Sequence, residues 1–123
     1  MTGAQLKKAL LFIYRDAAWL GNHTEFYQLS KGMHVVYSKG EHKLLKCELD
    51  GEEVEDDKIY VVGIQEFHYN NLPEFFDLTY EEVKANGEPK VLTTSDVQTL
   101  LEYFENNKHL GFGLEGRLEL VDE

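Results

Sequence analysis

The sequence predicts one α+β domain over residues 1–123, built as a mixed, mainly antiparallel sheet with flanking helices. Two stretches, 3–19 and 95–106, have apolar residues at helical spacing. Two others, 33–38 and 43–49, are joined by a short turn as in a β-hairpin. Helical crossovers between predicted strands are few, which favours α+β over α/β. A chain of 123 residues is long enough to bury a working core as one domain.

The first predicted element is a helix over 3–19. Thr2 and Gln5 have the spacing of a capping box, which satisfies two free backbone N–H groups at a helix start. One face of the helix is apolar, and it consists of Leu6, Ala9, Leu10, Ile13, Tyr14 and Ala17. Gly21-Asn22 is the predicted end of the helix.

Three strands are predicted next. A short one covers 26–29, a clearer one covers 33–38, and 43–49 pairs back onto it across a turn at 39–41. Alternation places Leu45, Cys47 and Leu49 on one face of the last strand and Leu44, Lys46 and Glu48 on the other. Cys47 is therefore interpreted as an inert core thiol.

The run 59–64, IYVVGI, has β-branched and aromatic residues and no charge. This pattern predicts a central strand covered on both faces, and a buried helix is the alternative. Gly63 favours the strand. The residues that follow, 65–71, are polar and aromatic together, which suits either a loop that holds a ligand or a hydrated turn with one inward Phe.

The last third of the chain contains two more capped helices and a strand. Thr79 and Glu82 form a second capping box, before a short helix that stops near 86–87. Val91-Leu92 is a possible brief strand, and Ser95 repeats the capping pattern before the helix that ends at about 106. The alternating tail 116–121 predicts a final strand.

Composition excludes several classes of function. The net charge of −11 disfavours binding to nucleic acid or to an anionic membrane surface. No apolar run has the length of a membrane span. The single cysteine leaves no disulfide framework. The acidic loop 52–57 is interpreted as solvated, with a calcium site as the sharper alternative, although the EF-hand spacing is absent.

The residues predict no catalytic group and no metal ligand. The five histidines show no paired-ligand spacing, and each is interpreted as structural or solvent-facing. Gly21-Asn22-His23 matches a segment of metallophosphoesterase centres, but the Asp and His partners that such a centre needs are missing, so the match is interpreted as accidental.

Four segments in order resemble the C-terminal domain of the two-domain 5′-nucleotidase / UDP-sugar hydrolase family. TGAQLKKAL (2–10) is similar to the family's Thr-Gly-x-x-Leu-Lys-x-Ala helix. FYQLSKGMHVVY (26–37) is similar to its Phe-Leu-Gln-Val-Ser-Gly-Leu segment and the strand after it. KIYVV (58–62) with Phe67 is similar to its Tyr-x-Val strand and loop, and Gly116-Arg117-Leu118 to its closing Gly-Arg-Ile. The resemblance covers the later part of that domain only.

The resemblance implies a role in recognising nucleotides, in nucleotide catabolism outside the cell, at its surface or in the periplasm. In this family an N-terminal metallophosphoesterase domain holds divalent metals and performs hydrolysis, while the C-terminal domain stacks the base between two phenylalanines. These fall on Phe26 and Phe67. Stacking contributes about 1–3 kcal/mol per base and needs no positive charge. By itself this chain, without that metal domain, is predicted to be inactive.

The departures from the family pattern concern the ribose contact. The family's loop Phe is followed by Gly-Gly-Asp-Gly-Phe, whose Asp binds the ribose, whereas this chain has Asn71-Leu72-Pro73-Glu74-Phe75. Pro73 offers neither a carboxylate nor an N–H group. Asn71 and Glu74 are therefore the remaining candidates beside the two rings. The family's Arg and Asn contacts come from a segment before the one that matches Thr2.

Two functions of different class follow from these observations. One is a nucleoside- or nucleotide-recognition part of a 5′-nucleotidase-type hydrolase. The other is a non-catalytic interaction module on the same fold, which the loss of Gly-Gly-Asp favours. A homodimer or a domain-swapped form is also expected, because strands near 33–49 would have an unpaired edge.

Overall fold

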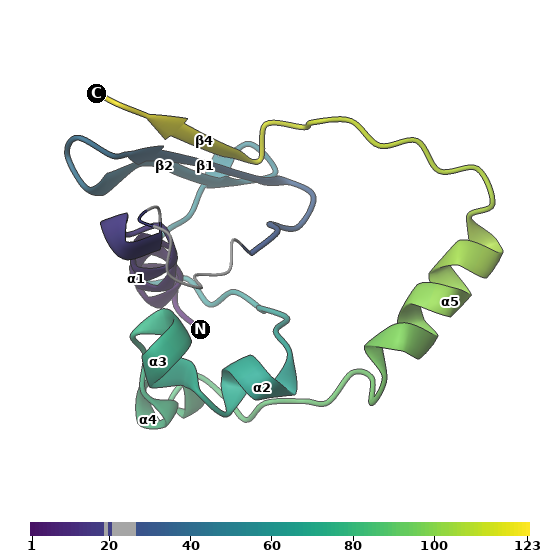
Figure 1. Cartoon of the computed structure of the whole chain (residues 1–123). Coiled ribbons are helices and arrows are strands. Elements are labelled where there is room, and N and C mark those ends of the chain that lie inside the picture. Colours follow the sequence, from purple (N-terminus) through teal and green to yellow (C-terminus); the bar gives the residue numbers. More distant parts are fainter. Residues whose placement is uncertain (19, 21–26) are drawn as a thin grey trace.

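A four-stranded mixed sheet with helices against one face forms the body of the molecule (Figure 1). We describe residues 1–18, 20 and 27–123 of the chain from a computed structural model. The strands are β1 (Met33–Ser38), β2 (Lys43–Leu49), β3 (Glu52–Glu53) and β4 (Leu118–Val121), in the order β3-β2-β1-β4. β1 pairs antiparallel with β2 and parallel with β4, and β2 pairs antiparallel with β3. The predicted α+β class is confirmed.

Helix α1 (Gly3–Ile13) lies across the inner face of the sheet. The predicted capping box is present, since the Thr2 hydroxyl accepts from the Gln5 N–H and the Gln5 side chain accepts from the Thr2 N–H. The helix is shorter than predicted: it ends at Ile13, and a separate 3₁₀ turn, η1, follows (Asp16–Ala18). At this end the Arg15 guanidinium stacks 3.7 Å from the centre of the Phe12 ring and donates to the Phe12 carbonyl.

The core lies between α1, the sheet and a short helix, α3 (Leu72–Phe76). Its buried apolar residues are Ala9, Leu10, Ile13, Tyr14, Val35, Tyr37, Cys47, Val54, Leu72, Phe76 and Leu78. Burial raises the pKa of Tyr14 to about 12 and also raises the pKa of the Cys47 thiol. Cys47 therefore behaves as the inert core thiol that the sequence predicts.

A bulge in β2 changes which of its leucines faces the core. Val36 pairs with Lys46, but Tyr37 pairs with Leu44, so Leu45 is the extra residue on that strand. Leu44 packs against the core while Leu45 is exposed, and the predicted shared face of Leu45 and Cys47 is wrong at Leu45. The extra residue moves the side chains beyond it to the opposite face of the strand. The sequence shows only the alternating pattern and does not show where a bulge interrupts it.

The outer face of the sheet carries a histidine between two glutamates. His34 on β1 lies 3.3 Å from Glu48 of β2, between Nδ1 and Oε2, and 2.9 Å from Glu119 of β4, between Nε2 and Oε1. These hydrogen bonds, with that to Glu119 the stronger, raise the pKa of His34 above its ordinary value. One side chain thus links three strands.

The predicted central strand at 59–64 is not a strand of the sheet. Ile59 forms one isolated bridge with Thr2, and Tyr60 exchanges hydrogen bonds with Met1, after which 61–64 has no regular secondary structure. The side chains of Ile59, Val61, Val62 and Ile64 are exposed. An apolar segment favours burial, but it forms a strand only where the backbone of a neighbouring strand can hydrogen-bond to it. In the sheet, β4 and not 59–64 pairs in parallel with β1.

Two other predicted strands are also absent from the described residues. Positions 27–29 and Val91-Leu92 have no regular pairing, and Phe26 lies outside the described residues. Residues 65–71, predicted as a loop, contain the short helix α2 (Glu66–Tyr69) and lead into α3. Helix α4 (Tyr80–Lys84) begins with the predicted capping box of Thr79 and Glu82.

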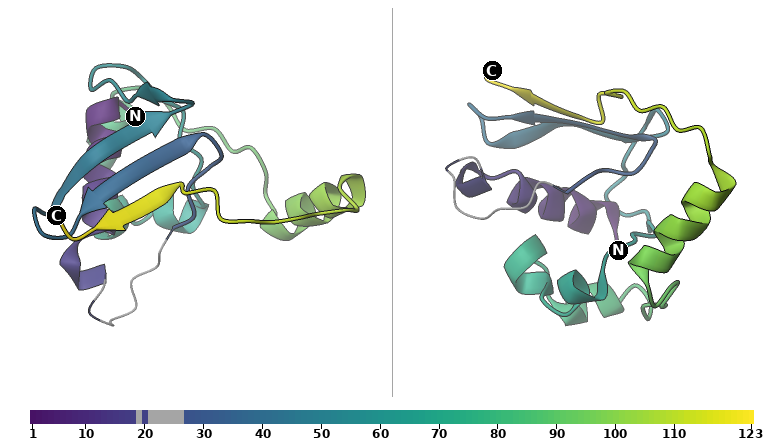
Figure 2. Two further views of the ribbon diagram at one scale, coloured as in Figure 1. Left: turned by 90° about the horizontal axis from the view of Figure 1, so that it is seen from above. Right: turned by 45° about the vertical axis from the view of Figure 1, so that its right-hand side comes forward.

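Helix α5 (Asp96–Asn106) stands apart from the body, on two extended arms (Figures 1 and 2). Its predicted start is confirmed in part: the Ser95 hydroxyl accepts from the Gln98 N–H, while the Gln98 side chain pairs with Glu102. None of the residues of this fully described helix is buried. The arms carry exposed apolar residues, which are Val91, Leu92, Phe112 and Leu114.

Candidate functional site

The strongest candidate for a binding site is a group of rings around α2 and α3, here called the aromatic cluster. Its members are Tyr27, Phe67, His68, Phe75 and Phe76. His68 is its buried centre, with the centroid of its ring 5.0 Å from Tyr27, 5.1 Å from Phe75 and 5.5 Å from Phe67. The rings meet edge to face, the geometry that the aromatic quadrupole favours. His68 thus has the structural role that the sequence predicts.

Phe67 is the exposed member of this cluster. Its side chain is 61% exposed, although Phe75 and His68 each lie with their ring centres 5.5 Å from it. Buried His68 and partly buried Phe75 contact the Phe67 ring, while most of its surface faces solvent. A fixed, exposed ring presents a flat apolar surface at little cost in conformational entropy, which suits stacking against another ring.

Asn71 holds the turn that carries Phe67. Its side-chain amide nitrogen donates to the Phe67 carbonyl oxygen at 2.7 Å, and its backbone N–H donates to the His68 carbonyl at 3.2 Å. Asn71 is also the residue that precedes α3. The amide oxygen of Asn71 has no intramolecular donor among the described residues and remains available as an acceptor.

The structure places the other predicted site residues as follows. Phe26 is outside the described residues. Its neighbour Tyr27 packs edge to face on His68, the residue that follows Phe67. Glu74 is exposed in the first turn of α3, one residue after Pro73. Phe67 therefore comes from α2, Glu74 from α3 and Asn71 from the turn between these two short helices.

Tyr27, Phe75 and Phe76 were not predicted from the sequence as members of the aromatic cluster. A signal was available, since 67–76 holds five aromatic or imidazole side chains in ten positions. Which of them is buried depends on the turn between α2 and α3, where Asn71 pairs back to Phe67. The register of two short helices was not predictable from a stretch expected to be a loop.

The four segments that resemble the nucleotidase domain meet in pairs. The N–H of Gly3 donates to the Lys58 carbonyl at 2.9 Å, which joins the first segment to the third. Arg117 donates to the Leu29 carbonyl at 2.7 Å, which joins the fourth segment to the second. These motif residues therefore have structural work in the fold, whether or not they also contact a ligand.

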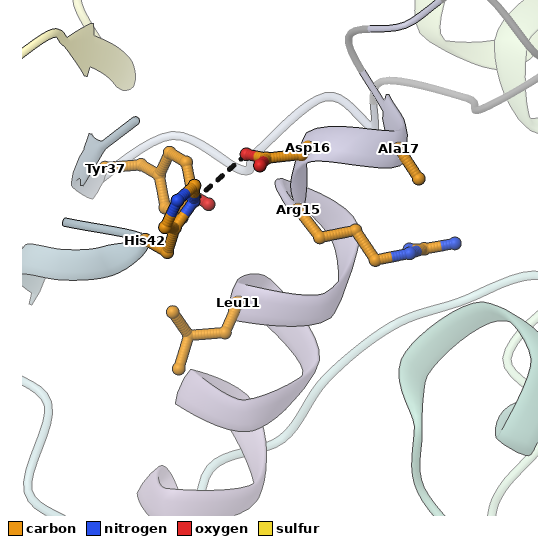
Figure 3. A pocket seen from close by; sticks show the side chains of 6 residues that line it. All are labelled: Leu11, Arg15, Asp16, Ala17, Tyr37 and His42. Atoms are coloured by element: carbon orange, nitrogen blue, oxygen red, sulfur yellow. Dashed lines mark ion pairs between the residues drawn. The ribbon is translucent and has the colours of Figure 1, made fainter. Parts of the chain in front are cut away.

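The second candidate site is a pocket at the C-terminal end of α1 (Figure 3). It is an open pocket of about 420 Å³, lined by Leu11, Arg15, Asp16, Ala17, Tyr37 and His42. His42 Nδ1 lies 3.0 Å from the Asp16 carboxylate, and Figure 3 shows Arg15 pointing away from this pair. The pocket therefore brings together one guanidinium, one carboxylate and one imidazole group, from Arg15, Asp16 and His42.

Neither site has a metal-binding arrangement in the described part of the chain. Within it, no group of three or more His, Cys, Asp or Glu side chains is placed to hold a metal ion. A membrane span would need a longer and more apolar helix than any found among the described residues. Comparison of the chain with models of protein families, with curated proteins and with solved structures finds no match.

Proposed function

We propose that this chain is the nucleoside-recognition part of a 5′-nucleotidase-type hydrolase, with the base stacked on Phe67. The observation that carries the proposal is the exposed Phe67 ring, which is 61% in solvent yet supported by His68 and Phe75. It stands in the segment that resembles the stacking loop of that family. Phe26, the second ring of the proposed pair, precedes Tyr27, which packs on the same cluster.

The polar contacts to the nucleoside are assigned to Asn71 and Glu74. Glu74 is exposed and presents a carboxylate that can accept a hydrogen bond from a ribose hydroxyl. The amide nitrogen of Asn71 donates one hydrogen bond to the Phe67 carbonyl, and the amide oxygen is an acceptor for a ligand. Pro73 replaces the family's ribose-binding Asp, so we expect a dissociation constant on the order of millimolar, about 4 kcal/mol of binding free energy.

The proposal divides the work between two domains. The net charge of −11 opposes a phosphate at this surface. An N-terminal metallophosphoesterase domain with divalent metals would hold the phosphate and carry out hydrolysis, outside the cell, at its surface or in the periplasm. This chain alone is then expected to hydrolyse no phosphate ester.

An NMR titration with adenosine tests the stacking role. Backbone amides of 66–70 are expected to shift, and the shifts should vanish in Phe67→Ala while the rest of the spectrum stays folded. Phe112→Ala is the matched control, because it also removes an exposed Phe ring, from the arm after α5. If wild type shows no shift, or if both variants behave alike, Phe67 does not stack a base.

An interaction module on the same fold is the second candidate, and one observation favours it. Helix α5 and the segment 59–64 both expose apolar side chains. Large exposed apolar surfaces mark sites of association. A chain that shows no adenosine-dependent shift but associates through these surfaces would fit this function and not the first.

A further inference from the structure

Helix α5 has an amphipathic face that the rest of the described chain leaves about half exposed. The α5 apolar face consists of Val97, Leu100, Leu101, Tyr103 and Phe104, and each of these side chains is between 49% and 62% exposed. Val97, Leu100, Leu101 and Phe104 recur at i, i+3, i+4 and i+7, which is the spacing of a helix that buries one side, and Tyr103 lies beside them. The face is therefore built to be covered, and the described residues of the same chain do not cover it.

The length of α5 strengthens this point. An isolated helix of eleven residues is marginal in water, because nucleation is costly and few backbone hydrogen bonds repay it. Most helices of this length are stabilised by packing of their apolar face. The Ser95 cap contributes at one end only. A stable α5 thus requires a surface to pack on.

A second uncovered apolar surface is present on the body of the molecule. The 59–64 apolar segment exposes Ile59, Val61, Val62 and Ile64, with Val61 98% exposed. Beyond Tyr60, the described residues provide no backbone partner for the N–H groups of 61–64. The four residues 61–64 are uncharged and have no regular secondary structure, and the segment contains no charged or Pro residue that would protect it.

We propose that α5 of one copy of this chain docks on the 59–64 apolar segment of a second copy, in a reciprocal exchange. The single chain contains both surfaces and leaves them apart (Figures 1 and 2). In a two-fold dimer each copy gives one helix and receives one, so both surfaces are covered twice by a single symmetric arrangement.

The arms have the reach that exchange needs. Eleven residues, 85–95, separate α4 from α5, and eleven more, 107–117, separate α5 from β4. At about 3.3 Å per extended residue each arm spans up to roughly 36 Å, which is more than the diameter of a small domain. Both arms are largely extended and exposed, so they can cross to a neighbouring copy without unfolding the body.

The buried area is sufficient for a stable dimer. Half-exposed Leu, Val, Tyr and Phe side chains leave on the order of 50–100 Å² each in water, since fully burying an aromatic side chain removes about 150–250 Å². The nine side chains of both surfaces, taken in two copies, then bury on the order of 1,500 Å². Standard protein interfaces bury about 1,200–2,000 Å².

The strand edge expected near 33–49 is a poorer route to association than α5. β1 is paired on both sides, by β2 and β4, so the edge expected there is closed. The outer edge of β2 carries Lys43 and Lys46, and edge lysines discourage strand pairing. The exchange of α5 therefore replaces the strand edge as the contact in the expected dimer. It does not involve Phe67 and is independent of the proposed nucleoside site.

Sedimentation velocity tests the dimer. Wild type is expected to sediment as a dimer at high micromolar protein, and more completely at 0.5 M than at 0.05 M salt, because two chains of charge −11 repel each other. Leu100→Glu with Phe104→Glu should give a monomer. Glu105→Gln, on the exposed polar side of the same helix, should remain a dimer. A monomeric wild type at both salt concentrations overturns the proposal.

Disulfide trapping distinguishes exchange from closure within one chain. Val61→Cys and Leu101→Cys are made in separate chains, one of them tagged, and mixed under mild oxidation. A covalent dimer of one tagged and one untagged chain is expected. Cys47, which is buried and present in both chains, is the control thiol. The double variant should also run as a dimer on a non-reducing gel. A bridge within one chain, or no bridge between these positions, overturns the proposal.

Discussion

Replacing Gly3 by alanine should destabilise the protein, although glycine-to-alanine changes in helices normally stabilise. Gly3 is the first residue of α1 and is buried against the loop 54–58. A Cβ atom there would lie 2.1 Å from the Glu55 carbonyl oxygen and 2.9 Å from Cγ1 of Val54. Separations under 3.0 Å require a shift, and the first obstacle is backbone.

The expected loss is about 2–4 kcal/mol. The overpacking contributes about 1–3 kcal/mol. Moving the loop also weakens two hydrogen bonds, from Gly3 N–H to the Lys58 carbonyl at 2.9 Å and from Ala4 N–H to the Asp56 carbonyl at 3.0 Å. Each contributes about 0.5–1.5 kcal/mol. The better helix propensity of alanine returns about 1 kcal/mol.

Urea unfolding followed by circular dichroism measures this change. With a slope of about 1–3 kcal/mol per molar urea, the midpoint should fall by roughly 1 M or more. Gly63→Ala is the control, because a Cβ atom there meets nothing within 4 Å, and its midpoint should stay the same or rise slightly. A Gly3→Ala protein as stable as wild type would refute the packing of α1 on this loop.

Three further perturbations test the core, a helix cap and the sheet. Leu72→Ala removes a fully buried side chain between α1 and α3 and should cost about 2–5 kcal/mol in urea unfolding. Thr79→Ala removes the cap of α4 and should cost about 0.5–2 kcal/mol, seen as faster amide exchange in 80–84. His34 has a pKa raised above 6.5 by Glu119 and Glu48, so its stabilising contribution is complete below pH 6.5 and is lost as the pH rises through the raised value. His34→Gln should therefore lower the urea midpoint at pH 6 and do so less at pH 8, and an equal loss at both would contradict the ion-pair role.

Local signals in the sequence were sufficient for the elements whose stabilising contacts are close in the chain. The capping boxes at Thr2 and Thr79 form as predicted, since both partners lie within three residues. The hairpin of β1 and β2 forms because a short turn joins two strands that follow one another in the chain and pair antiparallel. The inert character of Cys47 followed from the same alternation.

The candidate site was predictable only at Phe67. Its exposure, and the support given by His68 and Phe75, depend on two short helices in a stretch expected to be a loop. Asn71 was selected for a ligand contact, but its amide nitrogen is engaged in holding the turn. Phe26 lies outside the described residues, so the proposed pair of stacking rings remains a prediction.

The sequence by itself determined the α+β class, the starts of α1, α4 and α5, the hairpin and the acidic composition, because these depend on composition and on neighbours a few positions apart. Only the tertiary structure decided that 59–64 stays outside the sheet and that α5 stands away from the body. The physical reason is the same in both cases. An apolar pattern states that a segment favours burial, but the surface that buries it is contributed by residues far along the chain, or by another chain.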